Sequence, residues 1–138
     1  MGRIGLDPGV YLLSSSEETF AFGLRVATSL PKSAVLALTG NLGAGKTTFV
    51  QGLGAGLGIQ EVIQSPTFIL LNVYEGLAHF DLYRIKSGGD FTALGFDEYF
   101  GKMMCAIEWP EKIQDILPKG HIRIHFEYQG KGRTATVS

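Results

Sequence analysis

One eight-residue segment, 40–47, constrains the fold of this chain more than any other. It reads Gly-Asn-Leu-Gly-Ala-Gly-Lys-Thr and matches G-x-x-x-x-G-K-[ST] at every fixed position. Its glycines let the backbone turn tightly, with N–H groups that point inward at phosphate oxygens. The helix that follows such a loop adds the positive end of its dipole to the same place. The segment therefore predicts a phosphate-binding loop between a buried strand and a helix.

The sequence on either side of the motif supplies that context. Residues 34–38 (AVLAL) form a short continuous apolar run, which is typical of a strand buried on both faces of a parallel sheet. A helix is expected from Lys46 to about Leu57. Residues 103–107 (MMCAI) predict a second buried strand. We therefore expect an α/β fold whose parallel sheet is covered by helices.

The remaining elements follow from hydrophobic periodicity and turn signals. Ser15 and Glu18 fit a capping box, which begins a helix that ends near Leu30 and buries the stripe Phe20, Leu24 and Ala27. We also expect strands at 10–13, 68–74, 77–81, 122–128 and 134–137, a loop at 87–89, and short helices at 91–100 and 111–116. Residues 1–9 look like a loose leader, and no linker divides the single domain at 1–138.

Composition narrows the function classes. The 138 residues carry a net charge of -1, from 12 basic and 13 acidic side chains, so charge alone does not indicate direct nucleic-acid binding. The single cysteine, Cys105, cannot form an internal disulfide, and its apolar surroundings favour a small buried hydrophobe over a reactive thiol. No apolar run reaches the roughly 18 residues of a membrane span, and residues 1–9 do not resemble a secretory signal. We expect a cytoplasmic protein that is not bound to a membrane.

A phosphate-binding loop needs an acidic residue at the end of a nearby strand to hold Mg²⁺. Lys46 should reach the β- and γ-phosphates and Thr47 should offer its hydroxyl to the ion. Asp81 and Glu108 each follow an expected strand, at the edge where such sheets bind ligands. One would serve the metal and the other would orient the attacking water, and the pattern alone does not assign the two roles.

Three neighbouring residues have two interpretations each. Trp109 is either a core residue or a residue that shapes the site or a partner surface. Arg84 could pair with an acid or reach phosphate. His79 is interpreted as a structural histidine with its hydrogen bonds satisfied inside the protein, rather than as a ligand.

The base of the nucleotide is expected to be adenine, since neither Asn41 nor Asn72 is followed by the lysine of the guanine signature Asn-Lys-x-Asp.

Four segments occur together in order: GNLGAGKTTFVQGL, SPTF at 65–68, HFDLYR at 79–84 and EWP at 108–110. In this combination the chain, from about Leu12 to Val137, resembles the TsaE family, also called YjeE. That family is the bacterial ATPase needed to make threonylcarbamoyladenosine in tRNA. The resemblance implies a three-layer P-loop NTPase-like fold with a mostly parallel central sheet. It also implies ATP or ADP and Mg²⁺ as ligands, and slow ATP hydrolysis that resets a complex of TsaB and TsaD.

The resemblance also implies roles for individual residues. The phosphates would be held by Gly43, Ala44, Gly45, Lys46, Thr47 and Thr48, with Mg²⁺ on Thr47 and Glu108. Lys46, Asp81 and Glu108 would be catalytic, with Asp81 supporting the metal or the water. Residues 65–67 would form a switch-like loop near the γ-phosphate, and Ser16 and Arg133 would approach the nucleotide. Asn41 departs from the family, which commonly has an acid there, so local hydrogen bonding should differ.

Two other functions fit a phosphate-binding loop. A small-molecule kinase would need an acceptor pocket and usually an arginine-bearing lid, for which 138 residues leave little room. A nucleotide-sensing module would bind ATP without useful hydrolysis. Assays of the purified protein with ATP and Mg²⁺, with and without TsaB and TsaD, separate these alternatives.

Overall fold

A computed structural model describes residues 6–40, 44–64, 70–129 and 132–138. Its strands are β1 (Gly9–Leu13), β2 (Val35–Gly40), β3 (Leu71–Tyr74), β4 (Leu77–Asp81), β5 (Met104–Glu108), β6 (Ile122–Gln129) and β7 (Gly132–Val137). Its helices are α1 (Ser16–Ser29), α2 (Ala44–Gly56), α3 (Gly88–Ala93) and the 3-10 helices η1 (Phe96–Tyr99) and η2 (Pro110–Ile116). The buried strands predicted at 34–38 and 103–107, and the helix predicted after the motif, are confirmed.

All seven strands form one sheet in the order β1-β7-β6-β2-β5-β4-β3. The four central strands β6, β2, β5 and β4 run parallel to one another, whereas β7 with β1 at one edge and β3 at the other are added in antiparallel pairs. Leu38 of β2 pairs with Glu108 on one side and with Ile124 on the other. Because the central strands are parallel, their carboxyl ends meet at one edge of the sheet.

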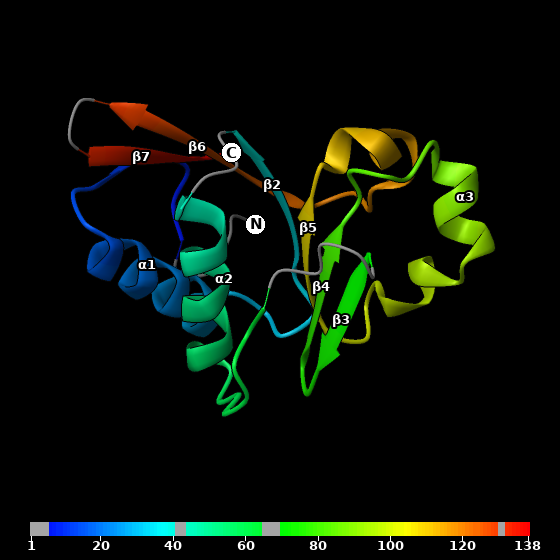
Figure 1. The fold of residues 1–138 in the computed structure, drawn as a ribbon, viewed down its shortest axis with the longest axis horizontal. Coiled ribbons are helices and arrows are strands. Elements are labelled where there is room, and N and C mark those ends of the chain that lie inside the picture. The colour runs from blue at the N-terminus through cyan, green and yellow to red at the C-terminus, as the bar shows by residue number, and fades with distance from the viewer. Residues whose placement is uncertain (1–5, 41–43, 65–69, 130–131) are drawn as a thin grey trace.

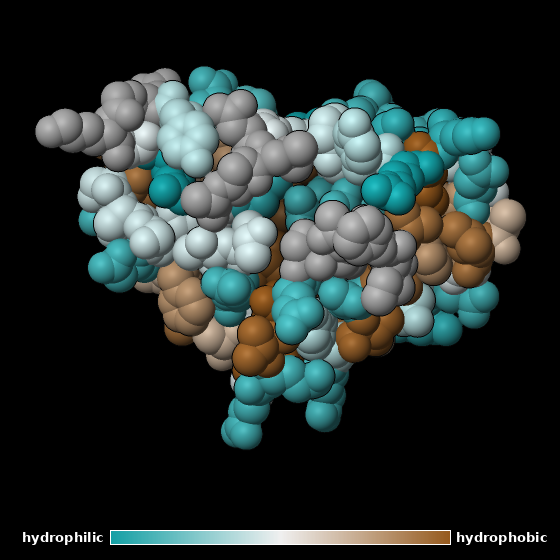
Figure 2. Space-filling model, in the orientation of Figure 1, coloured by the Kyte–Doolittle hydropathy of each residue, from teal (hydrophilic) through white to brown (hydrophobic). Residues whose placement is uncertain are grey.

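Helices cover both faces of the sheet (Figure 1). Leu36 and Leu38 of β2 pack into a core cluster with residues of α1 and α2, whereas Val35 packs into a second cluster with Phe91 of α3 and Ile113 of η2. This alternation follows from the two-residue period of a strand. Figure 2 shows hydrophilic and hydrophobic residues interspersed over the face in view, with hydrophobic residues gathered on the side of α3. The predicted three-layer fold with a mostly parallel central sheet is confirmed.

The start of α1 is capped by Ser15 as predicted, but the side chain of Glu18 has a different hydrogen-bond partner from the one expected. The Ser15 hydroxyl accepts a hydrogen bond from the Glu18 N–H at 3.2 Å, as expected. The Glu18 carboxylate, however, accepts from the N–H of Ser14 at 2.9 Å and from its hydroxyl at 2.7 Å. These hydrogen bonds favour the ionised carboxylate and hold the pKa of Glu18 below its usual range. The helix therefore begins where the sequence predicts, capped by Ser15, while the Glu18 carboxylate accepts both of its hydrogen bonds from Ser14.

The predicted buried stripe of α1 is wrong for two of its three residues. Phe20 and Leu24 are 38% and 40% exposed, and only Ala27 is buried. The residues that face the core include Phe22 and Gly23 instead. The reason is that α2 packs on α1 through glycines, and a glycine carries no hydrophobic signal that a periodicity could detect.

Other boundaries also differ from expectation. Gly88 and Gly89 belong to α3 rather than to a loop, because the Ser87 hydroxyl caps the helix by accepting from the Asp90 N–H at 3.3 Å. Leu6 is fully buried and Gly9 begins β1, so these positions of the expected leader pack into the domain. Residues 1–5 lie outside the described residues.

Cys105 is buried on the α3 side of the sheet, and burial raises the pKa of its thiol to about 12. This agrees with its interpretation as a small hydrophobe, since the reactive thiolate is disfavoured. Within the described part of the chain, no helix is long and apolar enough to cross a membrane.

Candidate functional site

The two predicted acids lie side by side at the carboxyl edge of the sheet. Asp81 ends β4 and Glu108 ends β5, and the two residues are direct Cα partners in the parallel ladder. Leu77 of β4 and Ala106 of β5 belong to the core cluster of α1 and α2, so alternation directs both acids to that face. The predicted positions of Asp81 and Glu108 at strand ends are confirmed.

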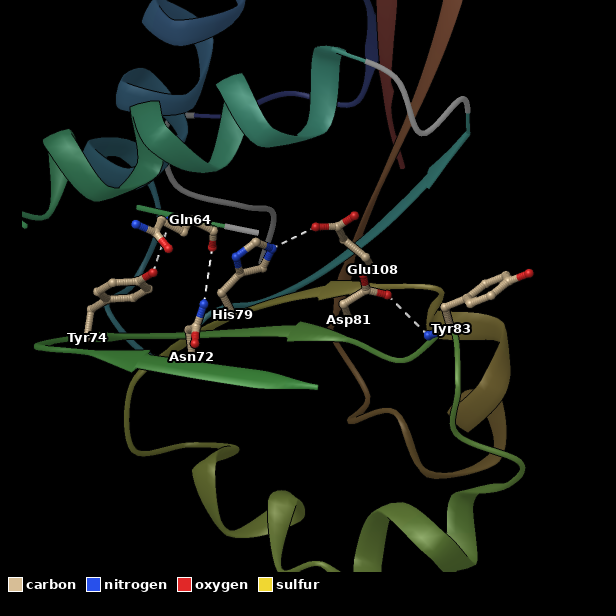
Figure 3. Close-up of polar contacts among 7 residues, drawn as sticks. All are labelled: Gln64, Asn72, Tyr74, His79, Asp81, Tyr83 and Glu108. Atoms are coloured by element: carbon tan, nitrogen blue, oxygen red, sulfur yellow. Dashed lines mark hydrogen bonds and ion pairs between the residues drawn. The ribbon is translucent and has the colours of Figure 1, made fainter. Parts of the chain in front are cut away.

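His79 joins this pair from inside the protein. The side chain is fully buried, and its Nε2 lies 2.7 Å from Oε2 of Glu108, which is itself only 4% exposed (Figure 3). Its Nδ1 is buried with no hydrogen-bond partner among the described residues. His79 is therefore a buried, bonded histidine as interpreted, but its partner is the candidate metal acid, which makes it part of the site.

Lys46 lies in the first turn of α2 and is only 3% exposed. Burial lowers the pKa of its ammonium group, while the negative charges of Glu108, Glu111 and Asp81 act in the opposite direction. Lys46 and the two predicted acids are thus brought together as expected. Glu111 was missed, since nothing in its sequence context marks it apart from its position three residues after Glu108.

The carboxyl group of Asp81 binds its proton more readily than an ordinary aspartate. Burial raises its pKa, and the neighbouring charge of Glu108 raises it further, while a 3.1 Å hydrogen bond from the Tyr83 N–H to Oδ1 opposes both. Tyr83 itself points away from Glu108 (Figure 3). The two acids therefore have different environments, with Glu108 bonded to His79 and Asp81 bonded to a backbone N–H.

Trp109 borders the site and packs, half-buried, against the α3-side core. Its φ of 59° places it in the left-handed region, directly after Glu108. Its ring centroid lies 5.0 Å from that of Tyr83 and 5.9 Å from Nζ of Lys46. Of the two interpretations, the structure supports the one in which Trp109 shapes the site.

The motif itself is described in part. Gly40 has a φ of 103°, and a Cβ at this position would overlap the backbone of Phe126 on β6, so only glycine fits. Gly45 is buried at the start of α2, and Thr47 and Thr48 are half-buried one turn later. Gly43 lies outside the described residues, and only the backbone of Ala44 is described.

The resemblance implies that Arg133 and Ser16 approach the nucleotide, and the structure places these two residues differently. Arg133 lies beside the motif, since a Cβ at Gly45 would be 3.5 Å from its Nη1. That Nη1 is buried without a partner among the described residues, and the guanidinium lies 5.6 Å from the ring centroid of Tyr128. Ser16 is exposed in the first turn of α1, where its hydroxyl donates to Glu17 at 3.1 Å. The structure therefore places Arg133 beside Gly45 of the motif, whereas the contact that the described residues give the Ser16 hydroxyl is with Glu17.

The predicted switch-like loop at 65–67 lies outside the described residues, but the positions that flank it are fixed. The Gln64 N–H donates to the Tyr74 hydroxyl at 3.1 Å (Figure 3). The Asp81 N–H donates to the Leu70 carbonyl at 2.8 Å. Both flanks are therefore tied to the hairpin that ends in Asp81.

Comparisons with known proteins agree with this geometry. Residues 13–135 match the family described as "Threonylcarbamoyl adenosine biosynthesis protein TsaE". A TsaE protein of Treponema pallidum (strain Nichols) is 43% identical over 129 residues, which cover 90% of this chain and 96% of the relative. The TsaE protein of Bacillus subtilis (strain 168) is 40% identical over 119 residues, which cover 83% of this chain and 74% of the relative.

A solved structure extends the likeness to three dimensions. The crystal structure of Bacillus subtilis YdiB matches with a TM-score of 0.79 and 33% identity, over 95% of this chain and 84% of that one. The match to the family over most of the chain, together with these relatives, establishes the predicted resemblance. The chain belongs to the TsaE family.

Proposed function

We propose that this protein is a cytoplasmic, Mg²⁺-dependent ATPase that serves threonylcarbamoyladenosine formation in tRNA, in a complex with TsaB and TsaD. The observation that carries the proposal is the convergence of Lys46, Asp81 and Glu108 where the motif helix meets the carboxyl edge of the sheet. The printed names of the relatives support the pathway, since both are tRNA threonylcarbamoyladenosine biosynthesis proteins.

The phosphates would be held mainly by backbone N–H groups, contributed by Gly43, Ala44, Gly45, Lys46, Thr47 and Thr48. Lys46 would add a positive charge whose effect is large because its side chain is removed from water. Arg133 would donate to the nucleotide from Nη1, which has no hydrogen-bond partner among the described residues and lies beside Gly45. Ser16 would approach the nucleotide from the start of α1.

The residues present fit Mg²⁺ as a partner of the phosphates. The carboxylate of Glu108 and the hydroxyl of Thr47 are oxygen donors, which this ion prefers. In the part of the chain that the structure describes, no group of three His, Cys, Asp or Glu side chains could hold a metal by itself. Mg²⁺ commonly has one or two protein ligands and completes its shell with water and phosphate oxygens. When bound, the ion would neutralise charge on the phosphates.

Asp81 is proposed to orient the attacking water. It lies beside Glu108, and its raised pKa makes its carboxylate a better hydrogen-bond acceptor for a water than an ordinary aspartate. The loop at 65–67, which is flanked by residues tied to the Asp81 hairpin, is proposed to respond to the γ-phosphate.

The protein alone is expected to hydrolyse ATP slowly, and TsaB with TsaD to accelerate it. No arginine occurs in the motif or next to Glu108, and an arginine finger contributes about 10³–10⁵-fold in P-loop proteins. A partner protein would supply such an arginine, or would bring an arginine of this chain into position. The measurement is steady-state phosphate release, first by the protein alone and then with both partners. Fast turnover that the partners leave unchanged contradicts the proposal, and ATP binding without hydrolysis under either condition identifies a nucleotide sensor.

Glu108→Gln is expected to raise the Mg²⁺ concentration that half-saturates ATP binding by about tenfold or more, because it removes a charged ligand. The substitution keeps the shape of the side chain and an oxygen that can accept from His79. Glu127→Gln is a matched control, since Glu127 also accepts from a histidine, His125, at 2.9 Å, but on the exposed surface of β6. If Glu108→Gln leaves Mg²⁺ dependence and hydrolysis unchanged, Asp81 is the main metal-side acid.

A further inference from the structure

We infer that His79 is a positioning residue, whose Nε2–H holds the Glu108 carboxylate in the orientation that binds Mg²⁺. The inference rests on the proposed function, because it concerns the metal-side acid of that site. It assigns a role to a histidine that sequence patterns indicate only as structural.

The strand register explains how the two side chains meet. His79 on β4 is the direct partner of Ala106 on β5, and Glu108 lies two residues further along the same face of β5. Ala106 is small and fully buried, so the imidazole ring can extend across it and reach the carboxylate diagonally. A larger residue at 106 would occupy the space that this contact crosses.

The contact itself places a hydrogen on Nε2 of His79. A carboxylate only accepts hydrogen bonds, so at 2.7 Å the hydrogen between Nε2 and Oε2 must belong to the histidine. The other ring nitrogen, Nδ1, is buried with no hydrogen-bond partner among the described residues. The contact with Glu108 is therefore the one hydrogen bond that the described residues offer to this ring.

Burial allows this hydrogen bond to restrict the orientation of the Glu108 carboxylate. His79 is fully buried and the Glu108 side chain is 6% exposed, so water does not compete with the imidazole for Oε2. With Oε2 held, the rotation of the carboxylate is restricted and Oε1 remains for the site. Hydrogen-bond partners of metal-ligating groups typically contribute about 10–100-fold to metal affinity. His125 Nε2 lies at a similar distance, 2.9 Å, from Oε1 of Glu127. Because these two side chains are 42% and 55% exposed, water competes for the hydrogen bond, and it should restrain the Glu127 carboxylate little.

The first test compares two substitutions. His79→Leu removes the donor while keeping a buried apolar side chain, and His79→Gln places an amide N–H₂ near the position of Nε2. We expect His79→Leu to raise the half-saturating Mg²⁺ concentration for ATP binding about tenfold or more, and His79→Gln to restore it to within about threefold of wild type. ATP binding measured without Mg²⁺ should stay unchanged in both. His121→Leu, which changes a histidine before the start of β6 at the opposite edge of the sheet, should behave as wild type.

The second test needs neither metal nor nucleotide. Side-chain ¹⁵N NMR of the metal-free wild-type protein should show a hydrogen on Nε2 of His79, with the signal assigned by its loss in His79→Gln. This measurement decides whether Nε2 carries a hydrogen even if His79→Leu does not fold. An Nδ1–H tautomer overturns the inference.

The outcomes separate this inference from the proposed function. If ATP binding by the wild-type protein does not depend on Mg²⁺, both are overturned. If ATP binding depends on Mg²⁺ to the same extent in the wild type and in a folded His79→Leu variant, only the positioning role is overturned. A lower melting temperature of His79→Leu with an unchanged Mg²⁺ requirement identifies a purely structural histidine, and so also overturns the inference.

Discussion

Lys46→Ala is expected to weaken ATP binding by about 10- to 150-fold while the protein stays folded, because a hydrogen bond to a charged group contributes about 1.5–3 kcal/mol. The substitution also leaves the charges of Asp81, Glu108 and Glu111 facing the phosphates without the ammonium group that these charges now surround. Both effects act in the same direction, since like charges repel strongly where water is excluded.

Isothermal titration calorimetry with ATP and Mg²⁺ measures this loss, and circular dichroism establishes that the variant is folded. Lys102→Ala is the control, because it makes the same change in net charge at an exposed position before the start of β5, at the opposite edge of the sheet. Wild-type ATP affinity in a folded Lys46→Ala variant contradicts the assignment of the motif as a phosphate-binding loop.

Gly52→Ala is expected to destabilise the protein by about 3 kcal/mol, because overpacking of a rigid contact costs this much. Gly52 lies on α2 against α1, and a Cβ there would overlap the backbone carbonyl of Phe20. The contact is reciprocal, since a Cβ at Gly23 of α1 would overlap the carbonyl of Phe49 on α2. Backbone atoms cannot rotate out of the way, so the two helices would have to separate.

Gly54→Ala is the matched control, two residues further along α2. A Cβ at Gly54 would meet side chains rather than backbone, those of Ile63 at 3.0 Å and Ile59 at 3.8 Å, and a side chain can adjust by a few tenths of an ångström where backbone cannot. The gain of up to about 1 kcal/mol in helix propensity offsets that displacement, so Gly54→Ala should be close to neutral. Urea denaturation of both variants measures the difference. Equal stability of the two variants would show that the helix contact at Gly52 tolerates a methyl group.

Several features of the fold could be predicted because their causes are local. The strands β2 and β5 are continuous apolar runs, and the β3–β4 hairpin turns at Glu75-Gly76, where Gly76 has a φ of 91°. The start of α1 depends on a serine and a glutamate three residues apart. In each case the residues that decide the structure are neighbours in the chain.

The candidate acids could be predicted for a related reason. Once β4 and β5 are expected to be buried strands of a parallel sheet, Asp81 and Glu108 at their ends must lie at the same edge. The motif at 40–47 places its helix at that edge as well. The fold class, the location of the candidate site and three of its side chains could therefore be predicted from local patterns in the sequence.

The arrangement of the candidate site around these side chains depends on contacts between segments that are distant in sequence. The contact of His79 with Glu108 joins residues 29 positions apart, and it depends on the register of two strands and on a small residue between them. Arg133 reaches Gly45 because β7 pairs beside β6, far from the motif in sequence. The buried face of α1 was likewise decided by close backbone contact at glycines. Hydrophobic periodicity reports which side chains avoid water, whereas these contacts depend on backbone approach and strand register, which arise only when distant segments pack together.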